Sequence, residues 1–230
     1  MSRAFRLVTY NIHSFIGRDG EYAPARTLMQ IEQLQAEVVA LQEVRGDDRQ
    51  GMEMLTAMAQ ANDYELVLGP TVVEQPGHHY GNALLVRGKQ VETRRHNLSR
   101  PGHEPRGAIE VRVSLAGEPW RIFATHLGLS PRERRWQVQS LLREIRRDEA
   151  VNTVLMGDLN EWFMWGRPLR WLKRYFRLSE QPATFPSRWP LLALDRIWVH
   201  PCARLHSVSA VKTPLSRNVS DHLPLLAEIY

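Results

Sequence analysis

Short apolar runs alternate with amphipathic stretches along the whole chain. Residues 109, 111 and 113 are apolar and alternate with charged residues, which is typical of a half-buried strand, whereas Leu28, Ile31 and Leu34 follow helical spacing. Applied throughout, this pattern predicts strands over residues 6–11, 37–43, 64–68, 81–87, 91–98, 109–113, 121–126, 151–156, 194–199 and 223–229, and helices over residues 24–36, 52–61 and 131–147. The mixture of hairpins with strand-helix-strand units predicts an α/β fold with two mixed sheets covered by helices on their outer faces.

The sharpest local signal is the start of the helix over residues 131–147. Ser130, Pro131 and Glu133 match a capping box with proline at the first helical position. The apolar residues Val138 and Leu141 then begin the stripe that a helix buries. We therefore expect the helix to begin at Pro131.

Composition supports a globular protein. The chain has 230 residues, of which 43% are hydrophobic and 24% charged, and this excludes disorder, collagen and coiled coil. No stretch rich in Gly, Ser or Pro divides it, so we expect one domain over residues 1–230.

The cysteine content and the N-terminal residues predict a cytoplasmic location. Cys202 is the only cysteine, so no intrachain disulfide forms. The N-terminal residues lack the apolar region of a signal peptide, and no apolar run approaches the ~20 residues that span a bilayer. No obligate protein partner is indicated.

The charge balance favours polyanionic partners. Thirty Lys and Arg residues against 25 Asp and Glu residues give a formal net charge of +5, which attracts nucleic acid or an anionic lipid surface. A modest positive charge also keeps a protein soluble, and that interpretation stays open.

Polar side chains gather where the predicted strands end. Taken singly, each has an ordinary explanation as a turn residue or a solvated charge. Together they supply oxygen ligands for a hard cation, two histidines and a carboxylate to orient one of them, which is what metal-assisted hydrolysis of a phosphate ester requires. These residues are Asn11, Glu43, His126, Asp158, Asn160, Asp195, Asp221 and His222.

The motifs around these residues resemble those of the endonuclease/exonuclease/phosphatase superfamily, whose fold is that of pancreatic deoxyribonuclease. They occur in the family's order from near the first residue to near the last, and as an ordered set they are highly specific. The motifs are Thr-Tyr-Asn-Ile-His (9–13), Leu-Gln-Glu-Val (41–44), Tyr-Gly-Asn-Ala (80–83), Ala-Thr-His-Leu (124–127), Gly-Asp-Leu-Asn (157–160), Leu-Asp-Arg-Ile (194–197) and Ser-Asp-His-Leu-Pro-Leu (220–225).

The resemblance implies a four-layered α/β/β/α sandwich and a Mg²⁺ or Mn²⁺ site. It makes Glu43 the principal metal ligand with Asn11 beside it, while Asp221 meets the metal directly or through water. Asp158 and Asn160 orient the attacking water and a phosphate oxygen, and Asp158 is also a candidate ligand for a second metal.

The same resemblance gives the histidines their roles. His222 is the general base or binds the attacked phosphoryl oxygen, Asp195 holds its imidazole, and His126 donates to the phosphate. Asn82 and Arg106 match substrate-binding positions, although an ordinary surface arginine explains Arg106 equally well. The sequence offers no identifiable Glu partner for His126 and no long basic loop, and both departures argue against duplex DNA as the substrate.

The segment 161–178 interleaves aromatic with basic residues. If it is helical throughout, Trp165, Leu169, Leu172 and Phe176 form one stripe and four arginines another. Such a helix suits single-stranded bases or an anionic membrane, and an ordinary packed helix is the alternative.

These features leave three hypotheses for function. A metal-dependent nuclease acting on DNA or RNA comes first, because of the charge and the basic aromatic segment. A phosphodiesterase or phosphatase acting on a phospholipid or another small phosphoester is the alternative, favoured by motifs such as Ala-Thr-Phe-Pro at 183–186. A non-catalytic binding module comes last, since every expected catalytic position is filled.

Overall fold

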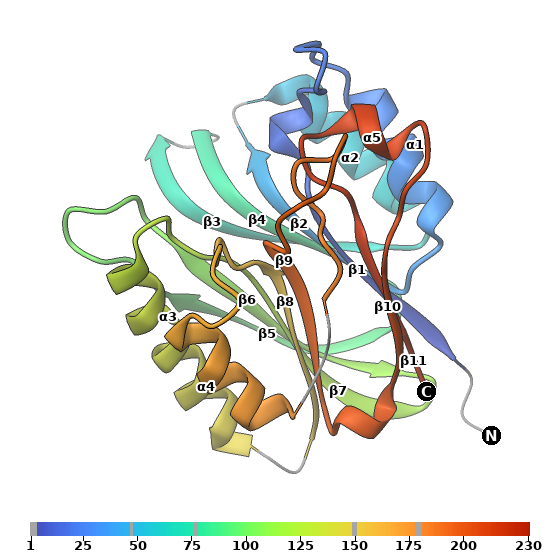
Figure 1. The fold of residues 1–230 in the computed structure, drawn as a ribbon. Coiled ribbons are helices and arrows are strands. Elements are labelled where there is room, and N and C mark those ends of the chain that lie inside the picture. The colour runs from blue at the N-terminus through green and yellow to red at the C-terminus, as the bar shows by residue number, and fades with distance from the viewer. Residues whose placement is uncertain (1–3, 47, 76–77, 149–150, 178–180) are drawn as a thin grey trace.

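Two β-sheets pack face to face at the centre of the structure, with helices on both outer faces (Figure 1). The computed structural model describes residues 4–46, 48–75, 78–148, 151–177 and 181–230. The six-stranded sheet has the order β10-β11-β1-β2-β4-β3 and the five-stranded sheet the order β5-β6-β7-β8-β9. Both are mixed, because β1 and β2 pair in parallel, as do β7 and β8, while the other pairs are antiparallel. The predicted α/β sandwich is confirmed.

The predicted strands and helices are present with shifted ends, and the structure adds one strand, β10, that the pattern did not predict. The strands are β1 (Phe5–Asn11), β2 (Val38–Arg45), β3 (Glu65–Gln75), β4 (His78–Val86), β5 (Lys89–Asn97), β6 (Gly107–Leu115), β7 (Glu118–His126), β8 (Asn152–Asp158), β9 (Asp195–His200), β10 (Leu205–Ala210) and β11 (Leu225–Ile229). The α-helices are α1 (Pro24–Leu34), α2 (Arg49–Ala61), α3 (Pro131–Ile145), α4 (Arg167–Phe176) and α5 (Ser216–Val219), and short 3-10 helices span His13–Phe15, Arg146–Asp148 and Cys202–Arg204.

Apolar side chains form three layers of core. One layer lies between the sheets and includes Trp120. A second layer, with Leu55, lies beneath α1 and α2 on the six-stranded sheet, and a third, with Leu172, lies beneath α3 and α4 on the five-stranded sheet. None of the helices in the described ranges is long and apolar enough to cross a membrane.

Two local predictions were wrong. Helix α3 begins at Pro131 as expected, but in the described structure the Ser130 side chain makes no capping hydrogen bond. The buried Glu133 instead accepts from the side chain of Gln137, so the capping box is absent. Helix α4 begins only at Arg167, so Trp165 lies in the preceding loop, 72% exposed, and does not extend the buried stripe. The end of segment 161–178 at residue 178 lies outside the described residues.

On the central strands, the side chains that face the inter-sheet core end in a polar residue at one edge of the sandwich. Successive strand residues point to opposite faces, so every second residue of β8 faces the inter-sheet core. Val154 and Met156 belong to that core, and Asp158 continues the same row at the strand's end. The apolar row is therefore completed by a polar residue at the edge of the sandwich, and Asn11 and His126 hold the corresponding positions on β1 and β7.

Candidate active site

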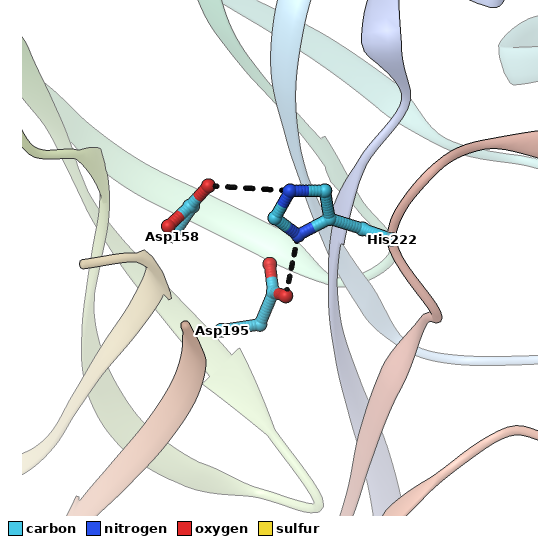
Figure 2. Close-up of side chains that lie close together, drawn as sticks. All are labelled: Asp158, Asp195 and His222. Carbon is cyan, nitrogen blue, oxygen red and sulfur yellow. Dashed lines mark hydrogen bonds and ion pairs between the residues drawn. The ribbon is translucent and has the colours of Figure 1, made fainter. Parts of the chain in front are cut away.

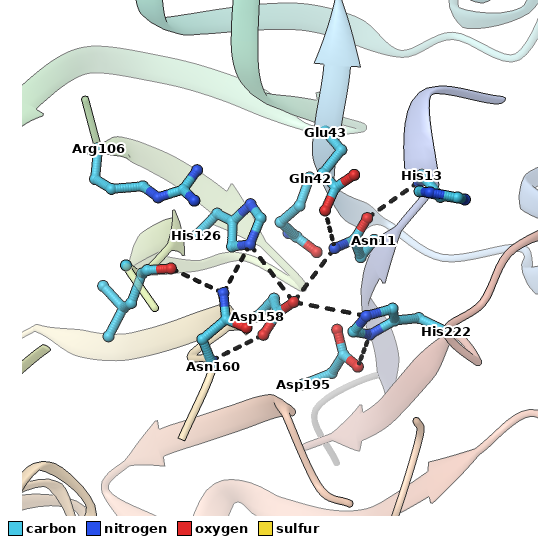
Figure 3. A network of polar contacts seen from close by, with 12 residues as sticks. Asn11, His13, Gln42, Glu43, Arg106, His126, Asp158, Asn160, Asp195 and His222 are labelled. Carbon is cyan, nitrogen blue, oxygen red and sulfur yellow. Dashed lines mark hydrogen bonds and ion pairs between the residues drawn. The ribbon is translucent and has the colours of Figure 1, made fainter. Parts of the chain in front are cut away.

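Three neighbouring strands of the five-stranded sheet place three polar side chains in a row. His126 on β7 is paired in register with Asp158 on β8, and Asp158 is paired with Asp195 on β9. All three are buried. The six-stranded sheet contributes the opposite wall, where Asn11 donates through Nδ2 to Asp158 Oδ2 at 3.3 Å (Figure 3).

Asp195, His222 and Asp158 form a chain of polar contacts (Figure 2). His222 Nδ1 lies 2.8 Å from Asp195 Oδ2, and its Nε2 lies 3.8 Å from Asp158 Oδ2. Burial opposes protonation of His222, but the charges of Asp195, Asp158 and Asp221 and the hydrogen bond to Asp195 outweigh it and raise its pKa to about 10. The hydrogen bond to Asp195 occupies Nδ1, which leaves Nε2 as the nitrogen that faces the site.

His126 has the opposite character. Its pKa is lowered to about 4 because burial and the charges of Arg106 and His222 outweigh the attraction of Asp158. Asn160 Nδ2 donates both to the Leu127 carbonyl oxygen at 2.9 Å and to His126 Nε2 at 3.0 Å. Since a carbonyl oxygen only accepts, this orients the amide, so Nε2 of the neutral ring accepts and its proton is on Nδ1. The hydrogen-bond partner of His126 Nε2 is thus Asn160, and Asp158 Oδ2 lies 3.6 Å from the same nitrogen.

A β-bulge turns Glu43 toward this cluster. The register of β2 against β4 shifts between Leu41 and Val44, and Glu43 has φ 59°, in the left-handed region. Its Oε1 accepts from Asn11 Nδ2 at 2.8 Å. Burial and the charge of Asp221 raise the pKa of Glu43 despite that hydrogen bond.

Asn11 presents its nitrogen, not its oxygen, to the carboxylates. Its Oδ1 instead accepts from the His13 backbone N–H at 3.0 Å. His13, which the sequence analysis missed as a site residue, also places Nδ1 4.0 Å from Asp221 Oδ1. As a metal ligand through Oδ1, Asn11 needs its amide turned over.

Arg106 and Asn82 lie at the border of the two sheets. Arg106 is buried, so its interpretation as an ordinary surface arginine was wrong. It pairs with Glu104 at 3.0 Å, and Figure 3 shows it beside His126. Asn82 Nδ2 donates to the Gly107 carbonyl oxygen at 3.3 Å and so connects β4 to β6.

Two further residues support His222, and the sequence analysis gave neither a role. Thr184 Oγ1 donates to Asp195 Oδ2 at 2.5 Å, and the Phe185 ring lies 4.9 Å from the His222 ring. Both residues belong to the Ala-Thr-Phe-Pro motif at 183–186. The motif was recognised in the sequence. Its contacts with Asp195 and His222 were not predicted, because the motif is separated along the chain from Ser-Asp-His at 220–222.

The donor set fits a hard divalent cation. Glu43 and Asp221 both offer carboxylate oxygens, and burial together with the charge of Asp221 raises the pKa of Glu43. Within the described residues, Asp195 Oδ1, Asn82 Oδ1 and Arg106 Nε are buried without a hydrogen-bond partner, so polar capacity is left for a ligand. Asp158, Asp195 and His222 also bring ligand atoms within 4.8 Å of one another. His222 Nδ1 is already bound by Asp195, so Nε2 is the nitrogen that His222 presents to Asp158.

Comparison with known proteins assigns the chain to a class. Residues 8–222 match the Endonuclease/Exonuclease/phosphatase family, and the chain belongs to it. Members of this family are generally metal-dependent phosphoester hydrolases. The chain is 30% identical to the uncharacterized protein YbhP of Escherichia coli (strain K12), over 99% of this chain and 96% of that protein.

Solved structures share the fold. The endonuclease/exonuclease/phosphatase from Beutenbergia cavernae superposes with a TM-score of 0.84 at 22% identity, over 99% of this chain and 71% of that one. D. rerio TDP2, complexed with a single-strand DNA product, superposes with a TM-score of 0.74 at 15% identity, over 99% of both chains. At these identities the similarity shows the fold alone.

Proposed function

We propose that the protein is a Mg²⁺- or Mn²⁺-dependent phosphodiester hydrolase whose active site is the cluster of Asp158, Asp195 and His222 facing Glu43 and Asp221. The observation that carries this proposal is the chain of contacts from Asp195 through His222 to Asp158, with the Glu43 carboxylate on the opposite sheet. A cation held there by Glu43 and Asp221 supplies neutralisation of the phosphate oxygens, without which a phosphodiester is a poor electrophile.

His222 and Asp195 have distinct roles in this proposal. His222 acts through Nε2 as the general base, and Asp195 holds the imidazole through Nδ1. Asp158 and Asp221 raise the pKa of His222 and are also candidate metal ligands, so a bound cation would lower this pKa and favour the neutral ring that a base requires.

The neutral His126 and Asn160 lie where the phosphate binds. With Nε2 occupied by Asn160, His126 donates from Nδ1. Asn160 and Asp158 position the attacking water, and the backbone N–H of Asn160 fixes Asp158 through a 2.8 Å hydrogen bond to Oδ1. Arg106 adds a positive charge at this end of the site, and Asn82 completes its wall.

Nucleic acid is the first proposed substrate class, with the cytoplasm as the proposed location. The net charge of +5 and the shared fold with D. rerio TDP2, which was solved with a single-strand DNA product, support it. A phospholipid or other small phosphoester is the second candidate, favoured by exposed apolar loops beside the site. Salt separates the two, since a protein that grips several backbone phosphates loses affinity steeply as ionic strength rises.

The test is hydrolysis of bis(p-nitrophenyl) phosphate, plasmid DNA and a phospholipid panel with Mg²⁺, Mn²⁺ or EDTA. We expect metal-dependent cleavage of at least one substrate and a loss of turnover of about 10²-fold or more in H222A and E43A. H206A and E53A are matched controls outside the site and should retain full turnover. Turnover near the wild-type level in H222A or E43A contradicts the proposal.

A further inference from the structure

The most exposed apolar side chains of the described structure lie on three loops. Seven large apolar residues are between 54% and 80% exposed, whereas the other exposed ones are between 36% and 46% exposed. We name these seven side chains the apolar tips: Leu129, Trp162, Phe163, Met164, Trp165, Trp189 and Leu191. Exposed apolar surface at this density marks a site of interaction.

Each of these loops is continuous with the candidate active site. Leu129 follows His126 by three residues, and the run from Trp162 to Trp165 begins two residues after Asn160. The third loop starts at Phe185, whose ring contacts His222, and it leads into β9 at Asp195.

A buried ion pair holds two of the loops together. Arg134 Nε lies 3.2 Å from Glu161 Oε2, and the Arg134 guanidinium also donates to the Gly128 and Leu129 carbonyl oxygens. Arg134 lies near the N-terminal end of α3, and this helix packs on the five-stranded sheet beside α4 (Figure 1). Leu129 and the run from Trp162 to Trp165 are therefore held relative to each other and next to Asn160.

The charges around the apolar tips are positive. Each loop has an exposed arginine at its border: Arg132, Arg167 and Arg188. The acidic residue within these loops, Glu161, is buried against Arg134. The exposed residues Arg170, Lys173 and Arg174 extend the positive surface along α4.

The chemistry of the tips favours lipid over nucleic acid. Tryptophan and phenylalanine stack on bases, but Leu129, Met164 and Leu191 have no ring to stack with. Tryptophans with aliphatic residues, bordered by arginines, are instead the composition of surfaces that insert into the interface of an anionic bilayer. We propose that the apolar tips dock this protein on an anionic lipid bilayer, with the arginines contacting the headgroups.

Docking in this orientation brings the site to the headgroup layer. His126 and Asn160 directly precede two of the tip loops, and Phe185 of the third loop contacts His222, so these three residues lie next to the lipid surface. Docking favours the second candidate substrate class, a lipid-headgroup phosphoester; that consequence rests on the proposed function, whereas docking itself does not.

Vesicle co-sedimentation tests the proposal. The probes are vesicles of phosphatidylcholine alone and of phosphatidylcholine with phosphatidylglycerol, at low salt with EDTA. The variants are W162S/W165S/W189S, which removes three tips, R167Q/R188Q, which removes two charges, and M29S/Y230S as a matched control. Met29 and Tyr230 are exposed but lie on α1 and at the C-terminus.

We expect the wild-type protein to bind the anionic vesicles more strongly than the neutral ones. The triple variant should lower the partition coefficient at least about tenfold, equivalent to about 1.4 kcal/mol. The arginine variant should remove the preference for anionic lipid, and the control should stay within about twofold of the wild type. Circular dichroism of each variant confirms folding.

Three outcomes overturn the proposal. The wild-type protein does not bind anionic vesicles, or the control variant loses as much vesicle binding as the triple variant. In the third, the triple variant no longer binds a single-stranded oligonucleotide but still binds the vesicles. Hydrolysis of bis(p-nitrophenyl) phosphate by the same wild-type preparation separates this inference from the proposed function. Hydrolysis without vesicle binding refutes docking alone. Vesicle binding without hydrolysis of any phosphoester refutes the proposed function alone.

Discussion

The buried pair of Arg134 and Glu161 gives a quantitative test of how the site loops are held. Both side chains are 3% exposed, and their closest nitrogen–oxygen distance is 3.2 Å. Glu161 also accepts from the Phe163 backbone N–H, so the pair orders the loop that follows Asn160. Removing one partner leaves an uncompensated charge in the interior, which costs about 3–5 kcal/mol.

This cost predicts a large fall in melting temperature. For a chain of this size, 1 kcal/mol corresponds to a shift of about 2–4 °C, so R134M should lower Tm by on the order of 10 °C. The cost of E161Q should be greater, because the negative charge of Glu161 also stabilises the buried Arg196. Burial lowers the pKa of Arg196 to about 10 although Glu161 and Asp195 oppose that shift.

The double variant R134M/E161Q distinguishes a pair from two independent side chains. Each single variant leaves one unpaired charge in the interior, whereas the double variant leaves neither charge of this pair. The cost of the double variant should therefore be clearly less than the sum of the two single costs. Scanning calorimetry measures all three, with R147Q as control: Arg147 pairs with Glu144 at 2.6 Å but is 71% exposed, and such pairs contribute about 1 kcal/mol or less. A shift in R134M no larger than that in R147Q, or an additive double variant, refutes the reasoning.

Two further predictions concern stability elsewhere in the five-stranded sheet. Burial opposes ionisation of Glu110, but hydrogen bonds from His96 and Arg121 outweigh it and lower its pKa. This stabilisation is complete above the unfolded-state pKa of about 4.3 and is lost as pH falls through the lower folded-state pKa. E110Q should therefore make the free energy of unfolding, measured by urea titration, depend less on pH below about pH 4.3. Gly157 has φ +146°, and a Cβ there would lie 1.8 Å from a carbonyl oxygen of β7. G157A should therefore lower the free energy of unfolding by more than about 3 kcal/mol, against about 1 kcal/mol for the control G20A, where a Cβ has open space. Equal melting temperatures of the two variants would contradict this.

The sequence was sufficient for the layers of the fold because buried strands and amphipathic helices have distinct periods. It did not reveal β10, an edge strand that pairs with β11 and has no fully buried residue, because a strand without a buried face produces no clear apolar pattern. It also placed Trp165 on a helix, since an apolar residue at helical spacing looks the same in sequence whether it is buried or lies at an exposed loop tip.

The site was predictable to the extent that strand ends carry its residues. The register that aligns His126, Asp158 and Asp195 follows from the pairing of β7, β8 and β9, which the sequence analysis did not predict. The contact of Thr184 with Asp195 and the burial of Arg106 depend on tertiary packing, which a single sequence does not contain. The amide orientation of Asn11 is likewise set by the His13 backbone, not by residue type.

The candidate site depends on both sheets, and this ties its chemistry to the packing between them. Asp158 and Asp195 belong to the five-stranded sheet, whereas Asn11 and Glu43 belong to the six-stranded one, and His222 enters just before β11. The 3.3 Å and 3.8 Å contacts of Asp158 with Asn11 and His222 therefore span the two layers. Because a close-packed interior transmits displacements, the inter-sheet core sets the spacing of the candidate site residues. The loops that carry the apolar tips lie outside that core, so their sequence can vary without changing this spacing.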